Sequence, residues 1–599
     1  MQHKILIFVS LIIGLAGCNV SSSADLENTA ATEKTTAQAQ AFAEFKELFL
    51  DEYWSYSPSY GTYVGYYKYD DKLIVPNQAA REAEAAFLQR SLKSLATFDK
   101  AGLSASDATD YALIENQLKA DLWYLHEFRL HQWDPSQYNV ASIFGLIMNT
   151  EYKPLNERLR VVSRRLVNVP AYYQAAMESL RDPTPEHTDL AIQQNRGALG
   201  VFAKIIPEKI ALSTLSEQQR RLLAKRLDAA TDAIESYIAW LEAKKVTFSQ
   251  GDVRSFRIGT ELYEQKFKYD IVSDYTAVEL YQKAIAEKER LHARMYKITE
   301  QLWPKYLADQ ELPANKLVAI KQLIDHLSSR HVKREDFVEE IRRQMPIIQK
   351  FMDDNKLLDS DPTRPLVVRE APEYQRGIAG ASVDAPGPYD ATANTYYNVT
   401  PLDDYTPEQA ESYLREYNYW ILQILNIHEA TPGHYTQLMH ANKSPSKIKS
   451  IFGNGAMIEG WAVYSELMMM EAGYGNNEPE MWLMYSKWNL RAVINTILDY
   501  QVHVLGMEQA AAVDMLITEG FQEQTEADGK WRRVTVSQVQ LTSYFNGYAE
   551  ILAFREELKE KMGEKFDLRN FHNKFLSYGN APVPVIRRLM LAELGLEST

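Results

Sequence analysis

The sequence contains one cysteine, Cys18, among 599 residues, so no disulfide can form within the chain. It also lacks a surplus of positive charge, because 65 lysines and arginines face 80 aspartates and glutamates and give a net charge of −15. Proteins that bind nucleic acid present basic surfaces to the phosphates, so that class of partner is disfavoured. Long hydrophobic runs are absent as well, except for one at the amino terminus that is too short to span a bilayer.

This apolar run extends from Ile5 to Leu15 and predicts an export signal peptide over residues 1–17. It ends in a Leu-Ala-Gly-Cys segment that is similar to the cleavage site of bacterial lipoproteins. We therefore predict that Cys18 becomes the lipidated amino terminus and anchors the protein in a lipid bilayer. Asn19 follows the cysteine, and in such lipoproteins this residue favours the outer membrane over the inner one. The expected location is the bacterial cell envelope, on the outer membrane facing the periplasm.

Residues 18–42 are rich in serine, threonine, alanine and glutamine and show no apolar periodicity. This composition is typical of a flexible tether between a lipid anchor and a folded domain. Residues 43–599 contain no linker and no convincing repeat, and helical patterns dominate from residue 75 to residue 350. We predict one continuous, mainly α body with a small β element, built from strands near residues 363–369, 380–388 and 394–400.

Three side chains that could bind a metal ion or transfer a proton, His428, Glu429 and His434, lie within seven positions of one another. A helix is expected to lead up to them. A Thr-Pro-Glu-Gln segment that begins at Thr406 has a capping residue, a proline at the first helical position and a glutamine at the third. Apolar residues at three-and-four spacing continue to Leu425, so one helix should deliver His428 and Glu429 from a buried position.

The spacing of the two histidines requires a break in this helix. Six residues place two helical side chains about 120° apart and about 9 Å apart along the axis, too far for one tetrahedral ion. Pro432 supplies the break, because it has no N–H to donate and its ring collides with the carbonyl of His428. Gly433 is expected to adopt a positive φ and to bring His434 round to the same ion.

Two glutamates follow in a second predicted helix, which is apolar nearly all round. Glu459 and Glu466 are seven residues apart and therefore lie on one face. A buried carboxylate needs a cation or a donor, and an ion held by His428, His434 and Glu459 would meet that need. Glu466 either accepts a hydrogen bond from a ligand imidazole or is a solvated helix carboxylate, and the spacing alone leaves both interpretations open.

A third helical stretch carries Arg491, Asn495, Asp499 and His503 at intervals of four. Polar residues at this spacing are also found on the solvent-facing side of ordinary amphipathic helices. The functional interpretation is that Asp499 orients His503, which then donates a hydrogen bond to a developing oxyanion.

These motifs resemble the bacterial family known as domain of unknown function 885, over about residues 43–595. That family is grouped with the gluzincin-like metallopeptidase clan, so the resemblance implies a multi-helical gluzincin-like metallopeptidase fold. The residues that carry it are the segments His428–Gln437 and Glu459–Glu466, and then Pro58, Gly65, Tyr69, Asp70, Asp499, His503, Tyr544, Gly547, Phe566–Arg569, Phe571, His572 and Gly579.

The resemblance adds two expectations about the substrate. Peptidases of that clan pair the substrate backbone with an edge strand beside the metal helix, and residues 396–400 are our candidate, with Tyr396 and Asn398 as substrate-binding residues. An ordinary structural hairpin fits the same residues. Tyr544 would supply a phenol to the oxyanion; Tyr548 is chemically equivalent, and only the family pattern favours Tyr544.

The sequence thus predicts a peptidase that holds one zinc ion per chain through His428, His434 and Glu459. Glu429 would act as the general base, with His503 and Tyr544 stabilising the tetrahedral intermediate and Glu466 and Asp499 orienting histidines. Two alternatives stay open. One is a lipoprotein that binds peptides or envelope components without catalysis, and the other is a metal hydrolase of a non-peptide amide or ester.

Overall fold

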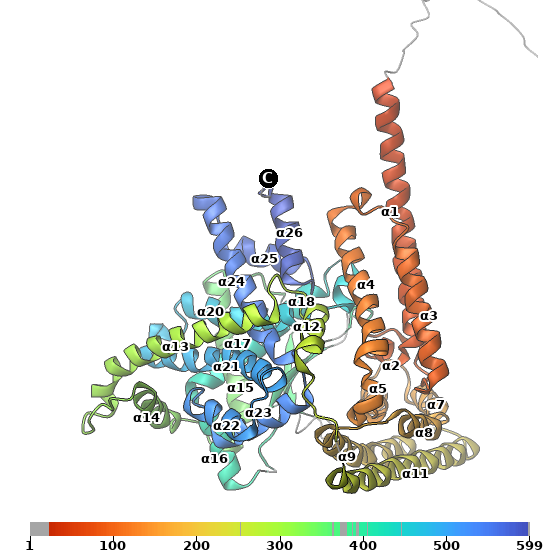
Figure 1. The fold of residues 1–599 in the computed structure, drawn as a ribbon, viewed down its shortest axis with the longest axis horizontal. Helices are drawn as coiled ribbons and strands as arrows, with labels where there is room; N and C mark the ends of the chain where they lie inside the picture. The colour runs from red at the N-terminus through yellow and green to blue at the C-terminus, as the bar shows by residue number, and fades with distance from the viewer. Residues whose placement is uncertain are drawn as a thin grey trace, which may run out of the picture.

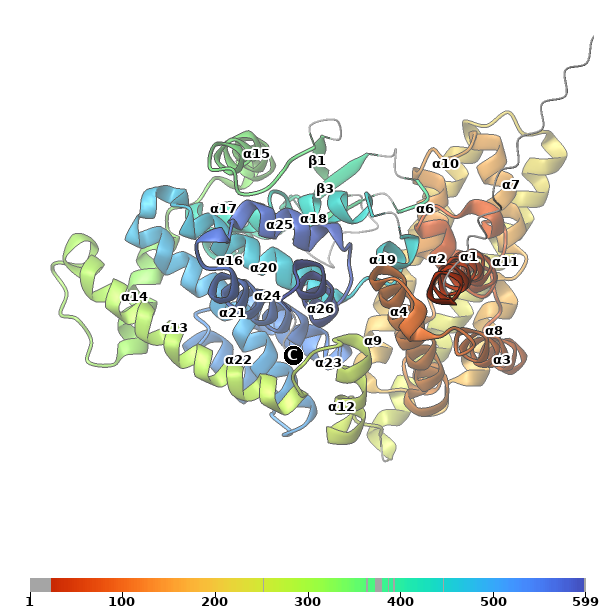
Figure 2. The same ribbon diagram turned by 90° about the horizontal axis from the view of Figure 1, so that it is seen from above.

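The computed structural model describes residues 23–251, 253–361, 365–371, 380–385, 387–390, 394–403, 405–444 and 446–596. The predicted signal peptide and Cys18 lie outside the described residues. Within them the chain is mainly helical, as predicted, with one small sheet (Figures 1 and 2). No helix in this part of the chain combines the length and the apolar character needed to cross a membrane.

The first helix corrects the prediction of a flexible tether for residues 23–42. Helix α1 runs from Ser23 to Tyr56 without interruption. Its sequence has no glycine or proline and is rich in alanine and glutamate, which favour helix. From Phe42 onward the helix is anchored by buried side chains, including Phe49 and Trp54.

The chain then forms a series of helices that surround two large cores and a small cluster of Trp123, Phe128 and Trp133. The amino-terminal helices after α1 are α2 (Pro58–Tyr63), α3 (Gln78–Leu95), α4 (Ala105–Trp123), α5 (Leu130–Trp133), α6 (Ala141–Asn149), α7 (Leu155–Leu166), α8 (Val169–Ser179), α9 (Pro185–Gly200), α10 (Ile206–Ala211) and α11 (Glu217–Thr247). Helices α6 to α11 enclose a core of their own, which includes Phe144, Tyr173 and Tyr237. The predicted single body therefore carries a second, smaller packed unit at one side (Figure 2).

The larger core joins α1, α3 and α4 to the helices of the carboxyl-terminal half. These helices are α12 (Gly259–Asp270), α13 (Ala277–Tyr306), α14 (Lys316–Ser328), α15 (Phe337–Asp354), α16 (Pro407–Glu416), α17 (Tyr419–Glu429), α18 (His434–Ala441), α19 (Lys447–Ile451), α20 (Gly455–Glu471), α21 (Pro479–His503), α22 (Gln509–Thr518), α23 (Gln524–Val536), α24 (Ser543–Met562), α25 (Leu568–Ser577) and α26 (Val583–Leu594). The helices α17, α20, α21 and α24 lie at the centre of this half (Figure 2).

One small sheet lies beside the motif helix, as predicted. Its strands are β1 (Leu366–Glu370), β2 (Ala381–Asp384) and β3 (Thr395–Val399), in the order β1-β3-β2. Strand β3 pairs in parallel with β1 and antiparallel with β2. The Tyr397 hydroxyl of β3 donates a hydrogen bond of 2.9 Å to Asn426 Oδ1, which fixes the sheet against α17.

The helix predicted to run from Thr406 to the motif is two helices. Its start is confirmed, because Thr406 and Gln409 form a reciprocal capping box with proline at the first helical position. The interruption comes at Asn418, whose side-chain oxygen accepts hydrogen bonds from the backbone N–H groups of Trp420 and Ile421 and caps α17. The apolar periodicity continues across this cap, so periodicity alone could not show the break.

Candidate metal site

The turn between Glu429 and His434 changes the direction of the chain between the two histidines of the motif. Helix α17 ends at Glu429, and α18 begins at His434 after a cis bond between Thr431 and Pro432. The predicted break is therefore confirmed, but the predicted role of Gly433 is wrong, since its φ is −73°. Glycine is needed there for space, because a Cβ would lie 1.8 Å from the carbonyl oxygen of His428.

The turn brings His428 and His434 together with Glu459 of α20. His434 Nε2 lies 3.3 Å from Glu459 Oε2, and His428 Nε2 lies 3.8 Å from the same oxygen. The two imidazole rings are nearly perpendicular, with centroids 4.8 Å apart. One ligand atom from each residue lies within 4.8 Å of the others, and among the described residues this is the one such group of histidine, cysteine, aspartate or glutamate side chains.

These separations fit a tetrahedral ion. Zinc binds imidazole nitrogen and carboxylate oxygen at about 2.0–2.2 Å, which places neighbouring ligand atoms about 3.3 Å apart at the tetrahedral angle. The observed 3.3 and 3.8 Å therefore match a shared centre with little adjustment. Two histidines and one glutamate are also a ligand set found in catalytic zinc sites, which keep a fourth position for water or substrate.

Glu466 lies behind His428 and orients it. His428 Nδ1 donates to Glu466 Oε1 at 2.7 Å, which leaves Nε2 directed at Glu459. The same Glu466 oxygen accepts a hydrogen bond of 3.0 Å from the indole of Trp488 in α21. Since the Glu466 side chain is fully buried, the interpretation of a solvated carboxylate is wrong. A carboxylate in this position fixes the tautomer of a ligand histidine and raises its basicity.

The site has an excess of negative groups, since Glu429, Glu459 and Glu466 lie around two imidazoles. Burial raises the pKa of Glu429 and of Glu466. Burial acts against a charge on His428 too, but its interactions with Glu459 and Glu466 outweigh this and raise its pKa to about 10. The arrangement therefore favours positive charge at its centre, and a divalent cation would supply it.

Tyr544 lies at the side of the site, next to His428. Its ring is stacked beside that of His428, with centroids 6.5 Å apart. Helix α24 reaches this position because two glycines allow it to cross α20 closely: a Cβ at Gly547 would lie 1.8 Å from Ala456 O, and one at Gly460 would lie 2.3 Å from Gly547. Burial, with Glu459 nearby, raises the pKa of Tyr544 to about 12, so its phenol keeps the proton at neutral pH.

His503 and Asp499 do not belong to this site, which corrects their predicted roles. Helix α21 reaches the site at Trp488, which contacts Glu466. Arg491 lies one turn further along this helix, and His503 lies about 18 Å beyond Arg491. His503 Nε2 instead bonds the carbonyl oxygen of Val534 at 2.8 Å. Asp499 accepts hydrogen bonds from the Tyr263 hydroxyl at 2.8 Å and from a backbone N–H, so both residues hold helices together.

Strand β3 is also not the predicted edge. It has a neighbour on each side, and its backbone is not free to pair with a substrate. Tyr396 lies under the guanidinium of Arg369, 3.7 Å from ring centroid to Cζ. Asn398 is buried and bonds both Arg369 Nε, at 2.6 Å, and Asp384 Oδ2, at 2.7 Å. Both side chains thus stabilise the sheet, and the interpretation of a structural hairpin is the better one.

Two residues at the site had no signal in the sequence. Trp488 reaches Glu466 through its indole, and Arg533 donates a hydrogen bond of 3.1 Å to the Tyr544 hydroxyl. Neither residue lies in a motif or at a distinctive spacing from the histidines. Trp488 could have been sought three residues before Arg491 on the same helix, but Arg533 is found only through its hydrogen bond to Tyr544 across the connection between α23 and α24.

The fold and the site together define a mainly helical protein with a candidate metal site of two histidines and one glutamate. A family model described as "Bacterial protein of unknown function (DUF885)" matches residues 58–590, and the chain belongs to this family. No curated protein matches.

Two solved structures share the fold. A protein of Shewanella oneidensis, described as "a putative lipoprotein of unknown function", is 52% identical, with a TM-score of 0.84 over 92% of this chain and 99% of that chain. A "putative lipoprotein" of Colwellia psychrerythraea is 18% identical, with a TM-score of 0.77 over 94% of this chain and 100% of that chain, which shows the fold alone. The descriptions are consistent with a lipid-anchored envelope protein.

Proposed function

We propose that this protein is a zinc-dependent peptidase with a gluzincin-like fold, anchored through Cys18 to the outer membrane and facing the periplasm. The observation that carries the proposal is the convergence of His428, His434 and Glu459 within 4.8 Å, beside the carboxylate of Glu429. Zinc bound by these three residues would polarise a substrate carbonyl and lower the pKa of water towards neutrality.

Glu429 is the proton acceptor in this proposal. It is adjacent to His428 in sequence and interacts electrostatically with His428, His434 and Glu459. Burial raises its pKa, so its carboxylate is a stronger base than that of an exposed glutamate, which suits a group that first takes a proton from water and then gives it to the leaving amine. A protein that only binds peptides would have no use for a carboxylate poised in this way.

Tyr544 and Glu466 have supporting roles. The Tyr544 phenol lies beside His428 and remains protonated, so it is able to donate a hydrogen bond to a developing oxyanion. Glu466 holds His428 by the bond to Nδ1, and Trp488 holds Glu466. The residues of the proposed site come from α17, α18, α20, α21 and α24, and these contacts between helices limit movement of the reacting groups.

The test is hydrolysis of a pool of random octapeptides by the purified protein, followed by mass spectrometry. We expect cleavage by the zinc-loaded protein, a loss of at least about 100-fold after chelation, and recovery with one equivalent of zinc. Cleavage that persists without metal would contradict the mechanism. Hydrolysis of simple esters or acyl amides without any peptide cleavage would favour the non-peptide hydrolase instead, and no hydrolysis of either would favour a binding protein.

A further inference from the structure

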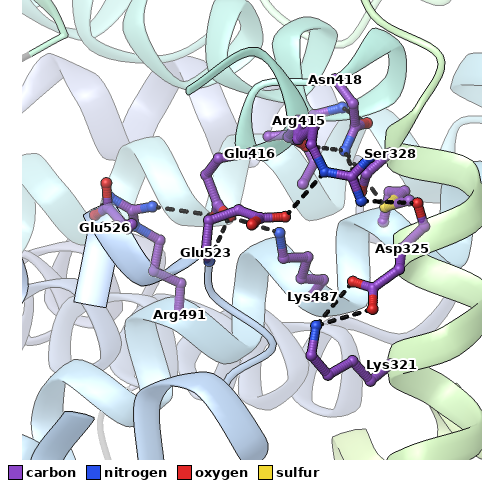
Figure 3. A network of polar contacts seen from close by, with 12 residues as sticks. Lys321, Asp325, Ser328, Arg415, Glu416, Asn418, Lys487, Arg491, Glu523 and Glu526 are labelled. Carbon is purple, nitrogen blue, oxygen red and sulfur yellow. Dashed lines mark hydrogen bonds and ion pairs between the residues drawn. The ribbon is translucent and has the colours of Figure 1, made fainter. Parts of the chain in front are cut away.

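A cluster of basic residues lies directly beside the candidate metal site. It consists of Lys487 and Arg491 from α21 and Lys530 and Arg533 from α23. Arg491 follows Trp488 by one turn and lies over its ring, with Cζ 5.2 Å from the centroid. Figure 3 shows Lys487 and Arg491 directed towards Glu416, with Glu526 beyond Arg491.

Two of these cations have carboxylate partners. Lys487 Nζ lies 2.8 Å from Glu416 Oε2, and both side chains are almost fully buried. Arg491 forms an ion pair with Glu526 and a longer one of 3.5 Å with Glu416. The two carboxylates of Glu416 and Glu526 are thus matched by Lys487 and Arg491.

The other two cations are left with no carboxylate of their own among the described residues. Lys530 is 3% exposed, and its nearest ion pair is with Glu526 at 4.0 Å, an acid already bound by Arg491. Arg533 is exposed and donates to Gln540 Oε1 at 2.8 Å and to the Tyr544 hydroxyl at 3.1 Å, both neutral acceptors. An exposed guanidinium that has no carboxylate partner is a favourable place for an anion.

Tyr544 lies between Arg533 and the candidate metal site. Its hydroxyl accepts the hydrogen bond from Arg533, and its ring is stacked beside His428. Consecutive residues of a peptide are about 3.8 Å apart, so an anion bound at Arg533 would belong to the substrate residue next to the scissile bond or to the one after it. A carboxylate on either substrate residue could accept two parallel hydrogen bonds from the guanidinium group of Arg533.

We propose that Arg533 binds the free α-carboxylate at the carboxyl end of a peptide, so that the enzyme removes residues from that end. This inference rests on the proposed hydrolase function. In the reaction the C–N bond breaks, the hydroxyl of water joins the carbonyl carbon, and the remaining proton goes to the amine of the released carboxyl-terminal piece. Glu429 transfers that proton, while Arg533 holds the released piece by its carboxylate.

The experiment uses two pools of hexapeptides with the same sequences and acetylated amino termini. One pool has free carboxyl termini and the other has carboxyl-terminal amides. We expect the full-length wild-type protein to cleave the acid pool about 10- to 100-fold faster, as measured by kcat/KM, since a charge-assisted hydrogen bond is lost with the amide. Equal rates on both pools, or cleavage governed by acidic side chains instead of the terminus, would overturn the proposal.

A matched pair of variants tests the residue itself. Arg533→Gln should reduce the preference for the acid pool to near one, mainly through KM, and Arg533→Lys should restore part of it. Arg532→Gln removes a neighbouring exposed charge from the same helix and should leave the preference unchanged. An equal loss of preference in Arg533→Gln and Arg532→Gln would show a general charge effect and would contradict the assignment.

A binding measurement separates this inference from the proposed function. The zinc-loaded Glu429→Gln protein is titrated calorimetrically with the acid pool and with the amide pool, where no turnover is needed. Tighter binding of the acids that Arg533→Gln abolishes would support the carboxylate site even if the wild type hydrolysed nothing. Turnover without any difference in binding or rate between the pools would instead leave the hydrolase in place and overturn the carboxylate site.

Discussion

Replacing Glu429 by glutamine should lower kcat/KM for peptides by about 10²- to 10⁴-fold, because glutamine matches the side chain in size but cannot accept a proton. The loss should fall on kcat, since Glu429 is not part of the group of ligand atoms formed by His428, His434 and Glu459. Zinc content and thermal stability should stay close to those of the wild type. The measurement is steady-state hydrolysis with metal analysis of the same samples.

The matched control is Glu408→Gln, an exposed glutamate in the first turn of α16 that should have no effect on turnover. The outcome also separates the alternatives named above. A protein that binds peptides without cleaving them would lose little on replacement of Glu429. If Glu429→Gln kept at least half of the wild-type activity while zinc remained bound, another group would have to be the base.

The second large effect is expected at Gly433, which has no side chain that could bind a metal ion or take part in the reaction. A Cβ there would lie 1.8 Å from the carbonyl oxygen of His428 and 2.4 Å from that of Ile427, so Gly433→Ala must displace the end of α17. We expect a destabilisation of about 1–3 kcal/mol, the usual cost of overpacking, and a loss of zinc affinity of at least tenfold because His428 moves.

Gly200→Ala is the control for this substitution. Gly200 lies in α9, and a Cβ there would meet nothing within 4 Å. The change should be neutral or stabilising by up to about 1 kcal/mol, since alanine favours helix over glycine. Thermal unfolding and competition for zinc with a chromogenic chelator measure both quantities. A Gly433→Ala protein with wild-type zinc affinity would mean that the close approach in the motif turn does not position His428.

Local chemistry in the sequence predicted the parts of the site that are close together in the chain. The capping box at Thr406 and the break at Pro432 depend on neighbouring residues, and both are confirmed. The seven-residue interval between Glu459 and Glu466 fixes a helix face, and the structure places both carboxylates towards His428. In each case the controlling interactions are within a few turns of one helix or its end.

The wrong predictions depend on long-range packing. His503 and Asp499 lie in register with Arg491, but register fixes only a direction around the helix, and the distance along α21 removes them from the site. Tyr396 lies on a strand that pairs with both preceding strands, β1 and β2, and the residues of β3 alone do not show whether that strand is central or at the edge. Tyr544 lies beside His428 because Gly460 and Gly547 let α24 lie against α20, two helices that are far apart in the sequence.

The most direct test of the central proposal is elemental analysis of the purified protein beside its His428→Ala and Glu459→Ala variants. The proposal predicts about one zinc per wild-type chain, and loss of that zinc in both variants while the helical circular dichroism is retained. A wild-type protein that holds no zinc after incubation with the metal at neutral pH would contradict the ligand assignment. It would also shift the interpretation of the cluster to buried histidines that are charge-paired with glutamates.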